Sequence, residues 1–184
     1  MENRKVPQMI QAIVDAGSRM ASIVEDMLTF VRKGDSSFSD HDPGQLMDKV
    51  LNLAASDYNL KKHYDFKSIT IIKAYEDNLP KIACEGSKIQ QVLLNLLNNG
   101  AHAMFEKKKT ARDYAPRFML RICHEMDPKM LRMEIQDNWP GMDKETCKRI
   151  FEPFFTTKPV GIGTGLGLSV SYFILTENHN GTLE

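Results

Sequence analysis

A helix with two asparagines one turn apart constrains this chain more than any other feature of its sequence. Residues 91–104 read QVLLNLLNNGAHAM, and their apolar side chains recur at helical spacing. Asn95 and Asn99 lie four residues apart, so a helix places both amides on one face. Amide oxygens suit a hard cation such as Mg²⁺, but two hydrogen-bonded amides in a buried helix fit the same pattern. This stretch alone leaves both interpretations open.

The composition fits a packed domain and excludes several other classes. Hydrophobic residues make up 42% of the 184 residues and charged residues 26%. Lysine plus arginine equals aspartate plus glutamate, at 24 each, which argues against a nucleic-acid groove. Three widely spaced cysteines are typical of a reducing compartment, not of a disulfide framework or zinc site. The chain lacks a long apolar run and a signal-peptide pattern, so we expect a cytoplasmic segment without membrane contact, whose parent protein can itself be membrane-anchored.

A seven-residue apolar repeat runs through residues 6–32. Such a repeat predicts a helix packed in a coiled coil or bundle. One helix cannot bury its own apolar seam, so we expect a homodimer through this helix, with a helix folded back on its own domain as the alternative. The seam consists of Val6, Ile13, Met20 and Met27, and of Met9, Ala16, Ile23 and Phe30 three residues later.

Alternating helices and strands are predicted after a polar linker at 34–42. Asp42 is a suitable N-cap for a helix over 43–58, and Ser87 for a central helix that continues to about residue 108. Two apolar runs separated by an Asp-Pro-Lys turn predict an antiparallel hairpin. The expected strands are 68–75, 81–85, 117–125 and 130–136, and a last helix is expected over 168–175.

A carboxylate followed by a glycine turn ends the second strand of this hairpin. Asp137 precedes the residues NWPGM, in which Gly141 permits unusual backbone angles and the close approach of a ligand. A carboxylate can accept a hydrogen bond from an exocyclic amine such as that of adenine. The same residues also fit an ordinary turn.

Two further segments, one rich in phenylalanine and one rich in glycine, follow this turn. Residues 151–158 read FEPFFTTK, with three aromatic rings beside a basic end, and residues 161–169 read GIGTGLGLS. Glycines that lead into a helix N-terminus offer free N–H groups to an anion, although a flexible connection has the same composition. The glycine segment lacks the Gly-Lys-Ser/Thr of a P-loop and the preceding strand of a dinucleotide-binding fold.

The order of these segments resembles the ATP-binding catalytic domain of bacterial two-component sensor histidine kinases. Their superfamily includes gyrase, the mismatch-repair ATPases and the ninety-kilodalton heat-shock chaperones. Residues 19–33 are similar to the second helix of the kinases' dimerisation and phosphotransfer domain. The resemblance therefore divides the chain into that partial helix (1–33), the linker (34–42) and a catalytic domain (43–184). The four boxes of the family resemble NLLNNGA (95–101), DNWPGM (137–142), FEPFFTTK (151–158) and GTGLGLS (163–169).

The resemblance implies a fold and a reaction. The fold is a two-layer α/β sandwich of the Bergerat type, with helices on one face of a mixed, mainly antiparallel sheet and one long helix before it. The cofactors are ATP and Mg²⁺. The reaction is transfer of the γ-phosphoryl group to a histidine and then to an aspartate on the receiver domain of a response regulator. The partners are that response regulator and a second copy of the chain.

The resemblance also implies roles for individual residues. Asn99 would ligate the Mg²⁺ that bridges the phosphates, and Asn95 would help to hold the metal or its water. Asp137 would accept the adenine amino group. Asn95, Asn99 and Lys158 would form the catalytic group. The nucleotide-binding set is Asn95, Asn99, Asp137, Gly141, Met142, Thr157, Lys158, Gly163, Thr164, Gly165, Leu166 and Gly167.

Departures from the family pattern leave two other functions open. Trp139 replaces the first glycine of the usual Asp-x-Gly-x-Gly, so a degenerate kinase that acts as a dimerising interaction module is one alternative. An ATPase of the same superfamily is the other, although hydrolysing members carry glutamate where this chain has Asn95. No histidine has the setting of the phosphoacceptor, and the family normally continues into two further strands. We therefore expect a C-terminally truncated fragment that does not autophosphorylate alone.

Overall fold

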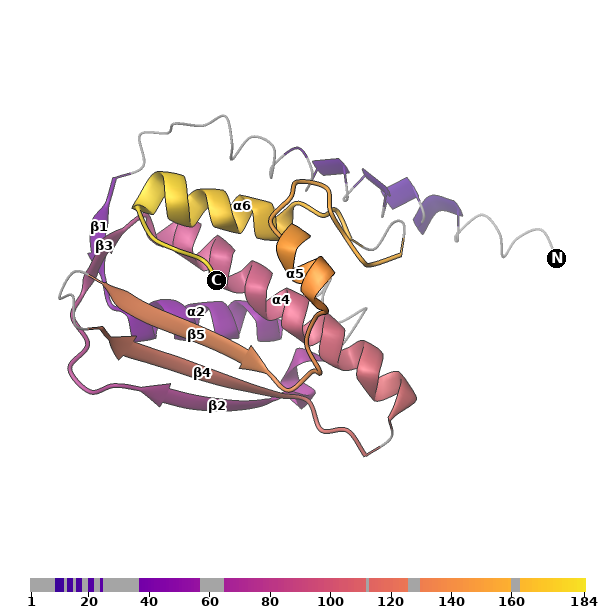
Figure 1. Cartoon of the computed structure of the whole chain (residues 1–184), viewed down its shortest axis with the longest axis horizontal. Coiled ribbons are helices and arrows are strands. Elements are labelled where there is room, and N and C mark those ends of the chain that lie inside the picture. Colours follow the sequence, from indigo (N-terminus) through magenta and orange to yellow (C-terminus); the bar gives the residue numbers. More distant parts are fainter. Residues whose placement is uncertain are drawn as a thin grey trace.

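Helices cover one face of a mixed sheet in the computed structural model of this chain (Figure 1). Helix α4 (Gly86–Thr110) lies between α2 (Pro43–Ser56) and α6 (Gly167–Phe173) and contacts both. This arrangement is the two-layer α/β sandwich that the sequence predicts. The structure describes residues 9–11, 13, 14, 16, 17, 20, 21, 24, 37–56, 65–111, 113–125, 130–159 and 163–184.

The described strands form two small sheets. The larger sheet has the order β2-β4-β5, in which β4 pairs with β2 in parallel and with β5 in antiparallel orientation. The antiparallel hairpin predicted from the two apolar runs is therefore confirmed. In the smaller sheet β1 pairs with β3 in antiparallel orientation. The strands are β1 (Ser39–His41), β2 (Thr70–Tyr75), β3 (Ile82–Cys84), β4 (Arg117–His124) and β5 (Leu131–Asp137).

Capping at the helix ends agrees with the sequence at α2 and differs at α4. The Asp42 carboxylate accepts the Gln45 N–H at 2.9 Å, which confirms the predicted N-cap of α2. The prediction that Ser87 caps α4 is wrong, because the helix begins at Gly86 and its N-cap is Glu85. The backbone N–H of Glu85 donates to Nε2 of His179 at 3.1 Å, so a contact distant in sequence fixes this helix start.

Two described elements lie where the sequence predicts none. Strand β1 falls inside the predicted linker 34–42, because its polar residues lack the alternation of a half-buried strand. Helix α5 (Lys144–Arg149) follows Asp143, whose carboxylate accepts the N–H groups of Glu145 and Thr146. The short elements η2 (Phe66–Ser68), a 3₁₀ turn, and η3 (Ile174–Asn178), a π-helical turn that continues α6, complete the described fold.

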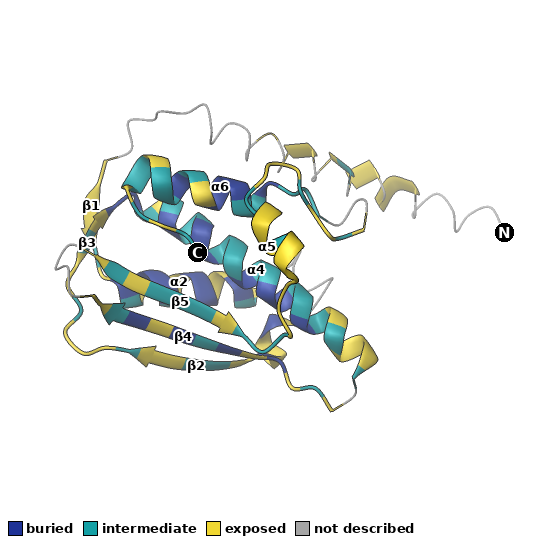
Figure 2. Cartoon of the chain, in the orientation of Figure 1, coloured by how far each residue is buried: buried dark blue, intermediate teal, exposed yellow. Residues whose placement is uncertain are grey.

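The main core lies between the sheet and α2 and α4, where Figure 2 shows the buried residues. Alternate side chains of β4, namely Phe118, Leu120 and Ile122, are fully buried, as the two-residue period of a strand requires. A smaller cluster joins α4 to α6 and fixes the position of the glycine segment that precedes α6. It consists of Val92, Leu166, Val170 and Ile174.

The described residues near the N-terminus are helical and expose apolar side chains. Met9, Ile13 and Met20 of the predicted seam are 64%, 71% and 63% exposed. A partner helix could cover these side chains, and the homodimer stays a prediction. The seam residues Val6, Ile23, Met27 and Phe30 lie outside the described residues.

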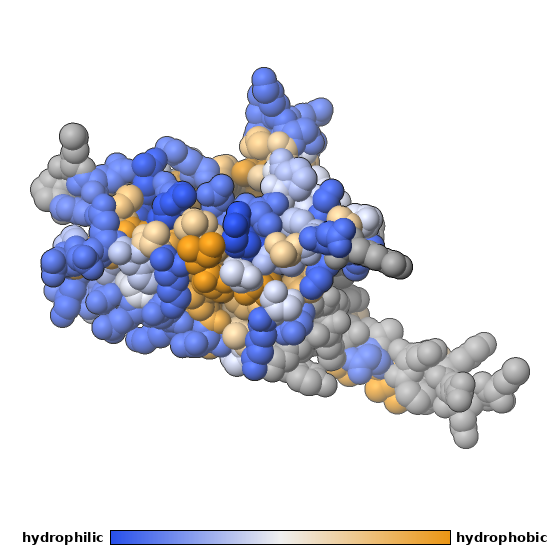
Figure 3. Space-filling model, turned by 90° about the horizontal axis from the view of Figure 1, so that it is seen from below, coloured by the Kyte–Doolittle hydropathy of each residue, from blue (hydrophilic) through white to orange (hydrophobic). Residues whose placement is uncertain are grey.

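Apolar side chains also reach the surface of the main domain. Seen from below in Figure 3, they form a central area on one face, surrounded by hydrophilic residues. Among the described residues, no helix combines the length and hydropathy that a membrane crossing requires.

Candidate functional site

A glycine in the middle of α4 lets this helix pack closely against the sheet beside Asp137. A Cβ on Gly100 would lie 2.7 Å from the Phe118 ring and 3.0 Å from Oδ2 of Asp137. Any larger side chain would push the helix away from β4 and β5. The close approach brings the carboxylate at the end of β5 next to the turn of α4 that carries Asn99.

The first asparagine of α4 binds the start of α6. The side-chain nitrogen of Asn95 donates to the carbonyl oxygen of Gly167 at 3.2 Å and to Oγ of Ser171 at 3.3 Å. The Ser171 hydroxyl, which is fully buried, donates to the same carbonyl oxygen at 2.8 Å. A Cβ on Gly167 would be only in ordinary contact with the Asn95 amide, at 3.7 Å. The amide of Asn95 therefore links the central helix to the glycine segment.

Asn99, one turn after Asn95, faces a lysine from the phenylalanine-rich segment. Nζ of Lys158 donates to Oδ1 of Asn99 at 3.0 Å. Burial lowers the pKa of Lys158 below its usual value of 10.5. The ion pairs among the described residues do not include Lys158. A half-buried cation without a carboxylate partner is suited to an anionic ligand.

Glycines hold the phenylalanine-rich and glycine-rich segments together. The Phe154 N–H donates to the Gly165 carbonyl oxygen at 2.9 Å, and both residues have positive φ, 67° and 68°. A Cβ on Gly165 would lie 2.4 Å from the Phe154 carbonyl carbon. A Cβ on Gly163 would lie 2.6 Å from Oγ1 of Thr156 and 3.2 Å from the Lys158 side chain. A side chain is therefore excluded beside Lys158 at Gly163 and beside the Phe154 backbone at Gly165.

The tryptophan that replaces a family glycine packs against the protein. Its backbone N–H donates to Oδ1 of Asp137 at 2.9 Å. Its ring is half-buried against the main core, and Nζ of Lys107 lies 5.8 Å from the ring centroid. Lys107 is eight residues beyond Asn99 on α4, about 12 Å along a helix axis. The indole therefore lies near the C-terminal end of α4, away from Asn99.

The remaining predicted residues differ in how closely they join this group. Thr164 Oγ1 accepts the N–H of Leu166, and Leu166 is buried against α4. Gly141 has a φ of 89°, which explains the glycine there, but a Cβ would meet no atom within 4 Å. Met142 and Thr157 are exposed. Gly161 of the predicted glycine segment lies outside the described residues.

Sequence reasoning missed three residues that support the site. Gly100 permits the approach to Asp137, Ser171 receives the amide of Asn95, and the Thr156 hydroxyl accepts the Lys158 N–H at 3.1 Å. Ser171 could have been suspected because it lies four residues after Gly167, one helical turn on. The role of Gly100 depends on packing against the sheet, which no local pattern reveals.

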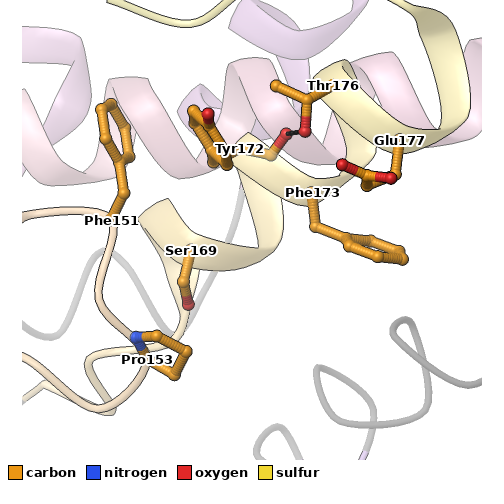
Figure 4. A pocket seen from close by; sticks show the side chains of 7 residues that line it. All are labelled: Phe151, Pro153, Ser169, Tyr172, Phe173, Thr176 and Glu177. Carbon is orange, nitrogen blue, oxygen red and sulfur yellow. Dashed lines mark hydrogen bonds between the residues drawn. The ribbon is translucent and has the colours of Figure 1, made fainter.

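A pocket of about 210 Å³ lies between the phenylalanine-rich segment and α6 (Figure 4). It contains none of the predicted site residues. The Phe151 and Tyr172 rings are 4.9 Å apart at its edge, and the Thr176 hydroxyl donates to the Tyr172 carbonyl oxygen at 2.9 Å. The lining residues are Phe151, Pro153, Ser169, Tyr172, Phe173, Thr176 and Glu177.

The donor set fits a metal held jointly with an anionic ligand. In the described part of the chain, no group of three or more His, Cys, Asp or Glu side chains could hold a metal ion. The amide oxygen of Asn99 already accepts a hydrogen bond from a cationic group, and amide oxygens suit Mg²⁺. Mg²⁺ is commonly bound by few protein oxygens together with substrate phosphates.

Comparisons with known proteins find sensor and histidine kinase proteins that are similar to this chain. Sensor protein TdiS of Thauera aromatica is 41% identical over 98 residues, which are 52% of this chain and 16% of TdiS. The crystal structure of full-length ShkA in complex with AMPPNP is 25% identical, with a TM-score of 0.67, covering 89% of this chain and 32% of ShkA. Histidine kinase ThkA in complex with response regulator protein TrrA is 21% identical, with a TM-score of 0.69, covering 98% and 47%.

This chain spans less than half the length of each of these three proteins. The likeness to ThkA shows the fold alone. The assignment to a family is based instead on a family model that matches more than half of this chain. Residues 84–184 match the histidine kinase-, DNA gyrase B- and HSP90-like ATPases, and they include α4, the Asp137 turn, the phenylalanine-rich segment and the glycine-rich segment. The chain therefore belongs to that family of ATPase domains, and proteins similar to it include the sensor protein and the histidine kinases named above.

Proposed function

We propose that this domain binds Mg-ATP between α4, the Asp137 turn and the glycine segment. The observation that carries the proposal is the hydrogen bond from Lys158 to Asn99, which puts a half-buried cationic group beside an amide oxygen. The described ion pairs give this lysine no carboxylate partner. The positive charge of Lys158 favours an anionic ligand, and a polyphosphate is such a ligand. The AMPPNP bound to ShkA supports the same ligand class.

Each group of residues has a separate task in this proposal. Asp137 accepts the adenine amino group through its carboxylate, and Gly141 and Met142 flank the base at the turn. Asn95 and Asn99 hold the metal or its water, and Thr157 and Lys158 meet the phosphates. When bound, Mg²⁺ would supply positive charge to the phosphate oxygens. The backbone from residue 163 to residue 167, with Thr164 and Leu166 between the glycines, surrounds the phosphates.

In the whole protein we propose phosphoryl transfer to a histidine. The bond between the γ-phosphorus and its bridging oxygen breaks, a phosphorus–nitrogen bond to the imidazole forms, and ADP leaves while the imidazole gives a proton to water. Positioning and charge neutralisation suffice for this step, so Asn99 and Lys158 need not act as bases. The receiver domain of a response regulator then accepts the group on an aspartate, a partner class that the ThkA–TrrA complex supports.

Calorimetric titration with AMPPNP and Mg²⁺ tests the nucleotide site. We expect the parent chain to bind and Asn99→Ala to lose about tenfold or more in affinity, because a metal contact is removed. Asn52→Ala is the matched control, since Asn52 is exposed on α2. Unchanged affinity in Asn99→Ala would contradict the metal assignment. Asp137→Asn should lose its preference for ATP over GTP, and a retained preference would contradict the adenine contact.

The interaction-module alternative predicts a different result in the same titration. If the indole of Trp139 closed the pocket, the parent would not bind and Trp139→Gly would. Because the ring packs against the core and Lys107, we expect the parent to bind without this substitution. Absence of binding in both the parent and Trp139→Gly would favour the hypothesis that the chain is a dimerising interaction module.

A further inference from the structure

Lys158 is fixed at the oxygen that we assign to the metal, and this inference rests on that proposed function. Its Nζ lies 3.0 Å from Oδ1 of Asn99. A metal ligand oxygen lies 2.0–2.1 Å from Mg²⁺, roughly an ångström closer than an ammonium nitrogen. Two cations cannot share one amide oxygen at these distances without strong mutual repulsion.

The lysine is held in this position by its own segment. Its backbone N–H donates to Oγ1 of Thr156 at 3.1 Å, which fixes the turn on which it lies. Gly163 faces the side chain so closely that a Cβ there would lie 3.2 Å from both Cβ and Cδ of Lys158. The absent side chain at Gly163 leaves the space in which the lysine reaches Asn99.

We propose that the Lys158 ammonium and the metal ion are alternative occupants of Oδ1 of Asn99. With metal-free nucleotide, Lys158 keeps its place on Asn99 and supplies the positive charge beside the phosphates. With Mg-nucleotide, Lys158 leaves Asn99 and interacts with phosphate oxygens instead. The contribution of Lys158 to nucleotide binding thus depends on whether the metal is present.

A thermodynamic cycle separates this arrangement from two independent cation sites. AMPPNP affinity is measured by calorimetry with Mg²⁺ and with EDTA, and the two values give a metal-dependence ratio for each chain. Independent cations would contribute additively, so Lys158→Met would leave the ratio unchanged. Alternative occupants would make Lys158→Met lose more affinity without metal than with it, and we expect the ratio to rise about tenfold.

Three further chains make the result specific. Lys158→Arg keeps a cation at this position and should return the ratio towards that of the parent. Lys148→Met removes an exposed lysine from α5 and should leave the ratio unchanged, which controls for net charge. Lys158→Gln gives a second neutral variant if Lys158→Met fails to fold, as judged by circular dichroism.

The outcomes distinguish this inference from the proposed function. Alternative occupancy is supported if the metal-dependence ratio rises in Lys158→Met and Lys158→Gln and returns towards the parent's value in Lys158→Arg. Equal or smaller ratios in the neutral variants overturn it, while nucleotide binding by the parent would still support the proposed function. Absence of nucleotide binding by the parent, with and without metal, overturns both.

Discussion

The side-chain nitrogen of Asn95 lies 3.2 Å from the carbonyl oxygen of Gly167 and donates a hydrogen bond to it. This contact joins the middle of α4 to the first residue of α6, 72 positions later in the chain. Because the same nitrogen also lies 3.3 Å from Oγ of Ser171, one amide satisfies two oxygens of α6. The residue that the family resemblance assigns to the metal thus also supports the structure around it.

We expect Asn95→Ala to destabilise the domain by about 1–2 kcal/mol, because the buried Ser171 hydroxyl loses a donor and the Gly167 carbonyl keeps only that of Ser171. Urea unfolding followed by circular dichroism measures the change. Asn52→Ala, at an exposed position of α2, should change the free energy of unfolding much less. Equal effects of the two substitutions would show that the contacts with Gly167 and Ser171 contribute no net stability.

Two glycine substitutions separate backbone strain from steric exclusion. Gly141 and Gly165 both have positive φ, but only at Gly165 would a Cβ meet another atom within 4 Å. Gly141→Ala should cost about 1–2 kcal/mol from its backbone conformation. Gly165→Ala should cost about 3 kcal/mol or more, because the Phe154 backbone must also move. Thermal unfolding of the two variants checks the order, and a smaller loss for Gly165→Ala would contradict the packing seen here.

Removing the positive charge of Lys158 should stabilise the nucleotide-free domain. Burial lowers the pKa of Lys158, so at neutral pH the folded chain carries the cost of a desolvated ammonium. We expect Lys158→Met to gain about 1 kcal/mol in the free energy of unfolding at pH 7. We expect nucleotide binding to weaken in the same variant. Lys158 would then lower the stability of the nucleotide-free domain and raise its affinity for nucleotide.

The pH dependence of this gain has a definite sign. As the pH rises through the lowered pKa, the folded parent releases the Lys158 proton before the unfolded chain does, so the parent gains stability relative to Lys158→Met. The advantage of the variant should therefore shrink between neutral pH and the usual lysine pKa of 10.5. Urea unfolding of both chains at a series of pH values measures the difference. A constant advantage would exclude the buried charge as its cause.

Removing residues 1–33 should leave a monomer. Met9, Ile13 and Met20 are exposed in the single chain, and an apolar seam of this kind is stable when a second helix covers it. Light scattering of the complete and the shortened chain gives the two masses, and circular dichroism checks that the shortened chain is folded. A dimer that persists without these residues would place the interface elsewhere.

Local patterns were sufficient to predict most elements of the fold. The four-residue spacing of Asn95 and Asn99 predicted one helix face, and the apolar run in 117–125 before an Asp-Pro-Lys turn predicted the strand whose inward residues form the core. Strand β1 was not predicted because its three polar residues show no alternation of polar and apolar side chains. Its structure depends on pairing with β3. The start of α4 was misplaced because His179 binds the Glu85 N–H from 94 positions away.

The sequence indicates residues for the candidate site, whose roles stay predictions, but it does not reveal the contacts between them. The order of the segments led to the assignment of Asn99 and Lys158 to the site. Their hydrogen bond joins positions 59 apart in the sequence and depends on how the segment before α6 folds back against α4. The packing role of Gly100 likewise depends on the distance between α4 and the sheet. Such relationships arise from tertiary packing, so a one-dimensional pattern contains no direct signal for them.

The hydrogen bond between Phe154 and Gly165 has a consequence for how this chain can vary. It joins the two ends of the stretch 155–164, so the entropy of closing that loop is set largely by the number of residues between them. Doubling the length of a flexible loop costs only about 0.6 kcal/mol. Insertions between Lys158 and Gly163 should therefore be tolerated thermodynamically far better than a single methyl group on Gly165. This part of the chain offers a place to attach a probe without unfolding the domain.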